Sequence, residues 1–116
     1  MKSENSILKI YVSNTDKFGM SLFYEHLVMK AYKKGISGAT AYRGITGYGL
    51  SGNKIVSGKF WEINEKLPVI IEMIDRTEVL ENFIEDIKSD IEAFGKGCLV
   101  YMQPIDIIIH QSGKKK

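Results

Sequence analysis

A glycine-rich stretch in the first half of the chain carries the residues best suited to bind an anion. Residues 38–54 begin with the alternation of a half-buried strand and continue into a loop. The loop glycines are Gly44, Gly47, Gly49 and Gly52. Glycine leaves backbone N–H groups uncovered, so a phosphate can approach them closely. Arg43 and Lys54 flank the opening with positive charge, and we interpret the stretch as a binding loop without catalytic residues.

Two phosphate-binding motifs fit part of this loop but fail on their context. Residues 47–52 spell G-x-G-x-x-G, which binds dinucleotides where it follows the first strand and opens a helix. Here β-forming residues follow it. A P-loop also fails, because Asn53 separates Gly52 from Lys54 and no hydroxyl residue comes next. The pattern favours neither a Rossmann enzyme nor a P-loop hydrolase.

Few other residues could do chemistry. His26 is expected on the solvent side of a helix and His110 near the chain end, so no paired metal site is predicted. Cys98 is expected to be a buried, inert residue of a strand. Glu72 is flanked by the apolar pairs Ile70–Ile71 and Met73–Ile74. We interpret it as an ion-pair partner on a strand face at a subunit contact, with a ligand contact as the alternative. The protein is therefore not expected to be an enzyme.

Composition predicts one soluble domain spanning residues 1–116, with a disordered tail at 113–116. The chain is 44% hydrophobic and 26% charged, which argues against disorder and against membrane insertion. No secretory leader is visible, so a cytoplasmic protein is expected. Basic residues prevail over residues 1–59 and acids over residues 62–92. This asymmetry favours a phosphorylated small molecule near the glycine loop, and no nucleic-acid partner is expected.

The hydrophobic pattern predicts the element order β-α-β-β-α-β. Strands are expected at 7–12, from 39 to 46, at 67–75 and at 98–102, with an apolar end strand Ile105–Ile109 after Pro104. The first helix should bury Met20 with Phe23 and end at Gly35. The second should start from a cap at Asp75 and end at Gly95.

This order predicts an α+β, ferredoxin-like βαββαβ sandwich. Right-handed crossovers place both helices on one face of an antiparallel sheet. The apolar strand residues Ile70, Ile74, Leu99 and Tyr101 cannot all face the helices. The open face should therefore be partly apolar, and an oligomer is expected.

Several segments together are similar to the PII-like branch of uncharacterised bacterial and archaeal proteins, which is related to the PII nitrogen-regulatory signal transducers. They are residues 38–44 (GATAYRG), Gly47–Gly49, residues 67–75 (LPVIIEMID) and the strand after Gly97. The likeness covers nearly the whole chain. It implies a PII-like homotrimer that binds an adenine nucleotide in clefts between subunits, and a loop after the second strand that contacts a membrane transporter or an enzyme.

The resemblance also implies which residues bind the ligand. Arg43, Gly44, Gly47 and Gly49 match the family's loop base, and Lys96 stands between Gly95 and Gly97 where the family has a glycine- and lysine-containing phosphate loop. The loop is shorter here, and the family's glutamine is absent at Leu50 or Ser51. The expected function is a signal-transduction protein that regulates a partner through its glycine-rich loop. No covalent cofactor is expected.

Two alternatives share this fold. A small acylphosphatase-like hydrolase would use Arg43 and Asn53, but residues 13–17 stand where its glycine loop should follow the first strand. A metal-responsive trimer of the divalent-cation-tolerance kind is disfavoured because histidine and cysteine are scarce.

Overall fold

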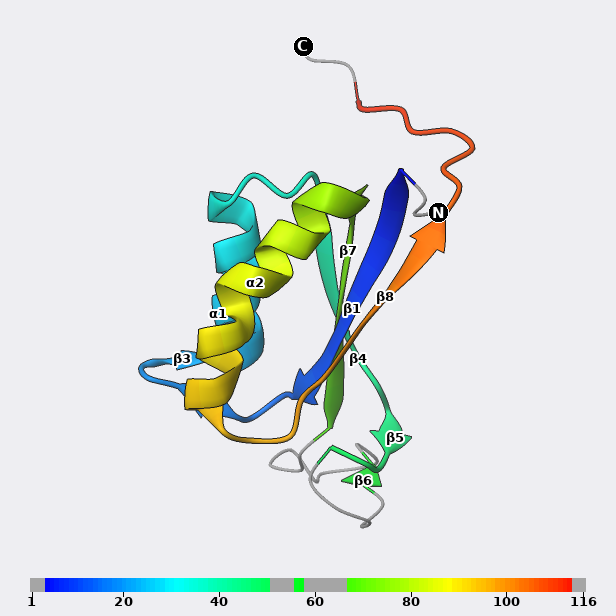
Figure 1. Ribbon diagram of the computed structural model, residues 1–116. Coiled ribbons are helices and arrows are strands. Elements are labelled where there is room, and N and C mark those ends of the chain that lie inside the picture. Colours follow the sequence, from blue (N-terminus) through cyan, green and yellow to red (C-terminus); the bar gives the residue numbers. More distant parts are fainter. Residues whose placement is uncertain (1–3, 51–55, 58–66, 114–116) are drawn as a thin grey trace.

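The computed structural model describes residues 4–50, 56–57 and 67–113 and has the expected ferredoxin-like architecture (Figure 1). Two helices cover one face of a four-stranded antiparallel sheet with the strand order β4-β7-β1-β8. The main elements are β1 (Asn5–Ser13), α1 (Phe23–Lys33), β4 (Ala39–Arg43), β7 (Pro68–Arg76), α2 (Thr77–Phe94) and β8 (Leu99–Ile105). Two short hairpins join β2 (Lys17–Phe18) to β3 (Ser21–Leu22) and β5 (Thr46–Gly47) to β6 (Val56–Ser57).

The core lies between the sheet and the helices. In β1 the side chains alternate, and Leu8, Ile10 and Val12 are fully buried against the helices. Their partners across the β1–β7 pairing are Met73, Ile71 and Val69. The helices contribute Phe23, Leu27, Leu80, Phe83 and Ile87, and Phe23 stacks on Phe94 at 3.9 Å between ring centroids. β1 is therefore a central strand of the sheet.

Both helices end at glycine, as predicted. Gly35 and Gly95 adopt the left-handed backbone conformation, with φ of 81° and 70°. The predicted cap at Asp75 is wrong, because the residue that precedes α2 is Arg76, which makes no side-chain cap hydrogen bond. Asp75 instead accepts hydrogen bonds from the backbone N–H groups of Ser37 (3.0 Å) and Arg76 (2.7 Å).

The expected start of the first helix is also wrong. The β2–β3 hairpin precedes α1, so Met20 lies in its turn and is fully exposed. Gly19 has a φ of 64°, which the tight turn requires. The carbonyl of Asp16 accepts the N–H of Phe23 at 2.9 Å and so fixes the helix start three residues later than Met20.

The two edge strands, β4 and β8, differ from the predicted strands in length and, for β4, in burial. All residues of β4 are exposed, whereas a half-buried strand was predicted; β4 ends at Arg43, and Ile45 is exposed beyond it. β8 continues through Pro104 to Ile105, which an edge strand tolerates because one side needs no N–H donor. The predicted end strand Ile105–Ile109 is wrong, because residues 106–109 are not in a strand.

The sheet face away from the helices is partly apolar, as expected. Register places Ile70 and Leu99 opposite Tyr11, Ile74 opposite Ile7, and Tyr101 opposite Lys9. Tyr11 and Tyr101 stack at 6.1 Å between ring centroids. The predicted oligomer stays a prediction, as does the tail, of which residues 114–116 lie outside the described ranges. In those ranges no helix has the length and apolarity needed to span a membrane.

Candidate functional site

The base of the glycine-rich loop depends on glycine at two positions. Gly44 donates its N–H to the carbonyl of Pro68 at 2.7 Å, and a Cβ at Gly44 would lie 2.8 Å from Pro68 Cγ. Gly47 pairs with Val56 across the short β5–β6 hairpin. Gly49 has a φ of 119°, a conformation that other residues rarely adopt. The sequence therefore sets the path of the loop base through Gly44 and Gly49.

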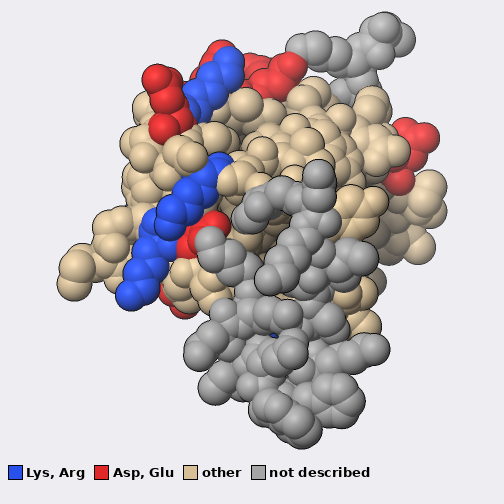
Figure 2. Space-filling model, turned by 90° about the horizontal axis from the view of Figure 1, so that it is seen from below, with Lys and Arg blue, Asp and Glu red and all other residues tan. Residues whose placement is uncertain are grey.

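The second predicted loop meets the first within one chain. Lys96 follows the left-handed Gly95, and its Nζ lies 3.9 Å from Oδ1 of Asp16. A Cβ at Gly97 would overlap the carbonyl of Leu50, so only glycine lets these two backbones approach this closely. The structure thus brings the chain that follows Gly49 against the loop that carries Lys96. The described part of this end of the molecule shows a short stripe of basic side chains with acids beside it (Figure 2).

Arg43 lies apart from Lys96. It ends β4, one edge of the sheet, whereas Lys96 precedes β8, the opposite edge. Arg43 lines a shallow hollow of about 440 Å³ on the helix side of β4, together with Asn14, Leu22, Tyr24, Ala41, Tyr42 and Val69. The structure therefore does not join Arg43 and Lys96 in one chain. Lys54 and Asn53 lie outside the described residues, so the site role of Lys54 and the hydrolase alternative stay predictions.

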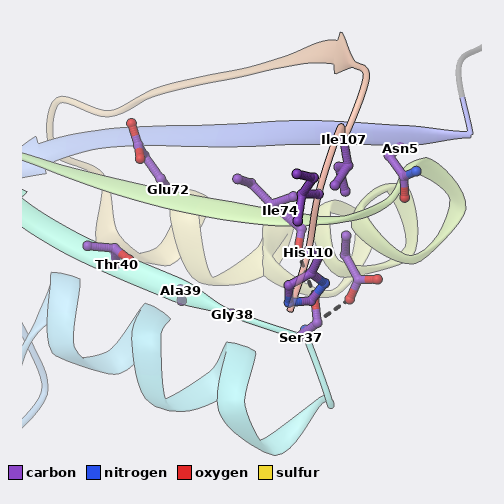
Figure 3. Close-up of a pocket in the computed structure, with 11 residues that line it drawn as sticks. Asn5, Ser37, Gly38, Ala39, Thr40, Glu72, Ile74, Ile107 and His110 are labelled. Carbon is purple, nitrogen blue, oxygen red and sulfur yellow. Dashed lines mark hydrogen bonds between the residues drawn. The ribbon is translucent and has the colours of Figure 1, made fainter. Parts of the chain in front are cut away.

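A larger hollow of about 590 Å³ lies at the other end of β4, away from the glycine loop. It is lined by Asn5, Ser37, Gly38, Ala39, Thr40, Glu72, Ile74, Asp75, Ile107, Ile109 and His110. Figure 3 shows Ile107 and His110 of the segment after β8 lying over Ser37 and Ile74. No lysine or arginine is among these described lining residues, and two carboxylates are. Such a lining suits an uncharged group with hydrogen-bonding edges better than a phosphate.

Ser37, Asp75 and His110 share this hollow without forming a catalytic triad. The hydroxyl of Ser37 donates to the carbonyl of Ile74 at 2.7 Å, and the carboxylate of Asp75 accepts backbone N–H groups. A nucleophilic serine needs its hydroxyl bound to a base. No sequence pattern indicates this hollow, because its walls come from four segments far apart in the chain.

Glu72 makes the ion pair that its position predicted. Its Oε2 accepts a hydrogen bond from Tyr42 Oη at 2.7 Å and lies 3.3 Å from Lys9 Nζ, on the open face of the sheet. The hydrogen bond from Tyr42, aided by Lys9, holds the pKa of Glu72 below its ordinary value against the opposing effect of desolvation. Whether Glu72 lies at a subunit contact stays a prediction.

His26 is not on the solvent side of its helix, which corrects the prediction. Its ring lies 4.8 Å from that of Phe18, and its Nε2 lies 2.9 Å from Oδ2 of Asp90 on α2. Lys30 Nζ bonds the same carboxylate oxygen at 2.7 Å. His26 therefore joins the two helices. Helical spacing in the sequence cannot show by itself that Asp90 faces α1.

Two further candidates from the sequence are the thiol of Cys98 and a metal site. Cys98 is half-buried and lies just before β8, so its predicted position inside a buried strand is wrong. Burial still raises the pKa of its thiol to about 11, as expected for an unreactive cysteine. Among the described residues no group of three or more His, Cys, Asp or Glu side chains is arranged to hold a metal ion.

Comparison with known proteins places the chain in a family. The model of the family DUF190, described as "Uncharacterized ACR, COG1993", matches residues 5–107. The chain belongs to the DUF190 family. It is 40% identical over 99 residues to the "UPF0166 protein MJ1524" of Methanocaldococcus jannaschii, covering 82% of this chain and 90% of that protein. It is 35% identical over 86 residues to a "UPF0166 protein" of Aquifex aeolicus, covering 74% of this chain and 81% of that protein.

A solved structure extends the comparison of this DUF190 protein to the PII fold. CPII from Thiomonas intermedia K12, determined with ADP and bicarbonate bound, superposes with a TM-score of 0.60 at 16% sequence identity. The match covers 85% of this chain and 83% of that chain. At this identity the likeness shows the shared fold.

Proposed function

We propose that this DUF190 protein is a PII-like regulator that binds an adenine nucleotide, or a similar phosphorylated small molecule, between the subunits of a homotrimer. Ligand binding changes the shape of the glycine-rich loop, and a partner, either a membrane transporter or an enzyme, reads that shape. The protein itself catalyses no reaction in this proposal and needs no covalent cofactor. The ADP bound to CPII, which shares the fold, supports the choice of ligand class.

The observation that carries the proposal is the approach of Leu50 to Gly97 beside Lys96. Two glycine-containing loops converge there, so backbone N–H groups and one ammonium group can face the same small anion. A phosphate bound at this junction contacts both loops. Its arrival and departure then bias the path of the chain from Gly44 onward.

The distribution of the candidate groups supports a ligand position between subunits. The 590 Å³ hollow beside Gly38–Thr40 and the contact between Leu50 and Gly97 lie at opposite ends of the sheet. Arg43 and Lys96 lie at opposite edges of the sheet. One small ligand reaches both kinds of group only if neighbouring chains supply them. The exposed apolar residues Leu99 and Ile74 on the open sheet face give such neighbours a surface to cover.

Thermal unfolding with adenine nucleotides tests the proposal. A ligand at about 100 times its Kd stabilises the folded state by about 2.7 kcal/mol, so AMP, cyclic AMP, ADP or ATP should raise Tm by several degrees. Lys96→Ala should weaken that shift, whereas Lys88→Ala, which removes an exposed lysine paired with Glu85 on α2, should leave it intact. Absence of a shift with every adenine nucleotide would sink the proposed ligand class.

Mixed trimers test the shared site. The Arg43→Ala and Lys96→Ala chains are each expected to bind nucleotide weakly on their own. When the two chains are unfolded together and refolded, part of the binding should return, because some clefts then receive an intact Arg43 from one chain and an intact Lys96 from its neighbour. Titration calorimetry on the mixture measures the recovered stoichiometry. Unchanged weak binding would place Arg43 outside the site.

Amide hydrogen exchange tests the signalling step. Nucleotide should slow exchange at Gly47 and Gly49 and at residues 95–97, because a phosphate orders both loops at once. Equal exchange with and without ligand would mean that the loop does not report binding.

A further inference from the structure

The ammonium group of Lys96 has a negatively charged neighbour in the ligand-free protein. Asp16 Oδ1 lies 3.9 Å from Lys96 Nζ, and the two side chains differ in exposure, 3% for Asp16 against 52% for Lys96. Asp16 is held in place, because its own carbonyl accepts the N–H of Phe23 at the start of α1. The carboxylate is therefore a fixed, desolvated charge, while the ammonium group is free to turn toward solvent.

A second negative potential acts on the same position. Lys96 follows directly after the C-terminus of α2, an 18-residue helix with no basic residue in its last turn. The partial negative charge of a helix C-terminus falls off within about one turn, so it reaches Lys96. The positive charge of Lys96, the single described lysine of this loop, is thus partly neutralised by a buried carboxylate and by the helix end. Its capacity to attract a multiply charged anion is smaller than that of an isolated lysine.

We propose that Asp16 sets the charge preference of the phosphate site at the Leu50–Gly97 junction. The carboxylate competes with a bound phosphate for Lys96 and repels each further phosphate charge placed near it. The site therefore favours ligands that present little phosphate charge, and it holds polyphosphates more weakly than its glycine loops alone would allow. This inference rests on the proposed phosphate position, but it concerns a residue outside the predicted site.

Inorganic phosphates test the inference without any nucleoside. Affinities of orthophosphate and tripolyphosphate are measured by titration calorimetry for the natural chain, Asp16→Asn and Asp86→Asn. Asp86 is the matched control, because it also pairs with a lysine, Lys34 at 3.3 Å, but both side chains of that pair are exposed. From Coulomb's law at a dielectric between those of a protein surface and water, Asp16→Asn should tighten tripolyphosphate binding on the order of tenfold, with orthophosphate tightened about twofold and Asp86→Asn changing neither.

A measurement on the natural chain protects the test against misfolding of Asp16→Asn. The ¹³Cγ resonance of Asp16 should shift when tripolyphosphate is added, and that of Asp86 should stay in place. An unmoved Asp16 resonance, an equal change of both affinities, or no tripolyphosphate binding to any of the three proteins would overturn the inference.

The outcomes separate this inference from the proposed function. If adenine nucleotides stabilise the natural chain but Asp16→Asn leaves the charge preference unchanged, the regulator proposal stands and the role of Asp16 falls. If tripolyphosphate behaves as expected while no adenine nucleotide binds, Asp16 has the assigned role and the nucleotide proposal falls.

Discussion

Tyr42 and Glu72 join the edge strand β4 to β7 by a side-chain hydrogen bond of 2.7 Å on the open face of the sheet. The bond is close to the proposed binding loop, because Tyr42 is followed directly by Arg43 and Gly44. Lys9 of β1 completes a row of polar groups across three neighbouring strands. The end of β4, from which the loop departs, is therefore tied to the sheet centre by side chains as well as by backbone pairing.

Replacing the hydroxyl of Tyr42 should cost little stability but change the ionisation of Glu72. Tyr42→Phe should lower the free energy of unfolding by about 0.5 kcal/mol, since both groups are partly exposed and solvent screens the bond. The pKa of Glu72 should rise toward its ordinary value, because the Tyr42 hydrogen bond is the main cause of its depression. Urea unfolding and an NMR titration measure the two effects. Tyr32→Phe, at an exposed tyrosine, is the control.

Removing the carboxylate of Asp90 should loosen the contact between α1 and α2. At pH 7, Asp90→Asn should lower the free energy of unfolding by about 1–2 kcal/mol, because it removes charge-assisted bonds to Lys30 and His26. Asp86→Asn, whose lysine pair is more exposed, should cost less.

The same variant has a pH signature. Desolvation works to raise the pKa of Asp90, but the bonds from Lys30 and His26 outweigh it and lower the pKa below the ordinary 3.8. A carboxyl with a depressed folded-state pKa contributes its stability above 3.8 and loses it as the pH falls through the folded value. The difference between the natural chain and Asp90→Asn should therefore be full at pH 6 and shrink in acid below pH 3.8. A difference that grows in acid would contradict this assignment.

The open sheet face should be where subunits meet. We expect light scattering to give three times the chain mass of 13.1 kDa. Leu99→Glu, at a half-exposed position on that face, should yield folded monomers, because a desolvated charge opposes association. Met20→Glu, at a fully exposed methionine in the β2–β3 turn, should leave the trimer intact. A monomeric natural chain would refute the trimer.

Gly97 should not tolerate a side chain. In Gly97→Ala the new Cβ would overlap the carbonyl of Leu50 and push the two loops apart. We expect a loss of about 1–3 kcal/mol of stability or a displaced loop, with weaker nucleotide binding in either case. Gly38→Ala should leave the free energy of unfolding nearly unchanged, because no atom lies within 4 Å of a Cβ built at Gly38. Denaturation and nucleotide titration of both variants separate the outcomes.

Cys98 should resist alkylation. Burial raises its pKa from 9.0 to about 11, so the thiolate population at neutral pH falls about a hundredfold relative to an unshifted thiol. Iodoacetamide should react slowly with the folded chain and quickly in denaturant. Stability should also fall between pH 9 and about 11, where the unfolded thiol ionises before the folded one. Rapid alkylation of the folded protein would show that Cys98 is accessible.

The sequence alone determined the order of the main elements, the C-terminal ends of both helices and the apolar open face of the sheet. These features depend on local information: the alternation around Leu8 and Ile10 has the period of a strand, and Gly35 and Gly95 supply the left-handed conformation that ends a helix. The apolar face followed from counting, because β7 and β8 carry more apolar residues than one face can bury.

Only the tertiary structure decided which distant side chains share a site. The paired residues come from different elements, and their pairing depends on strand register and helix packing. Examples are Asp90 with Lys30, Leu50 with Gly97, and the residues that line the hollow at Ser37. The β2–β3 hairpin shows the same limit. Met20 fits the helical period of Phe23 and Leu27, but the hairpin pairing and the bond from Phe23 to the Asp16 carbonyl exclude it from the helix. Spacing in a sequence fixes the face on which a residue lies, whereas the partner on the facing element is fixed by the packing of the whole chain.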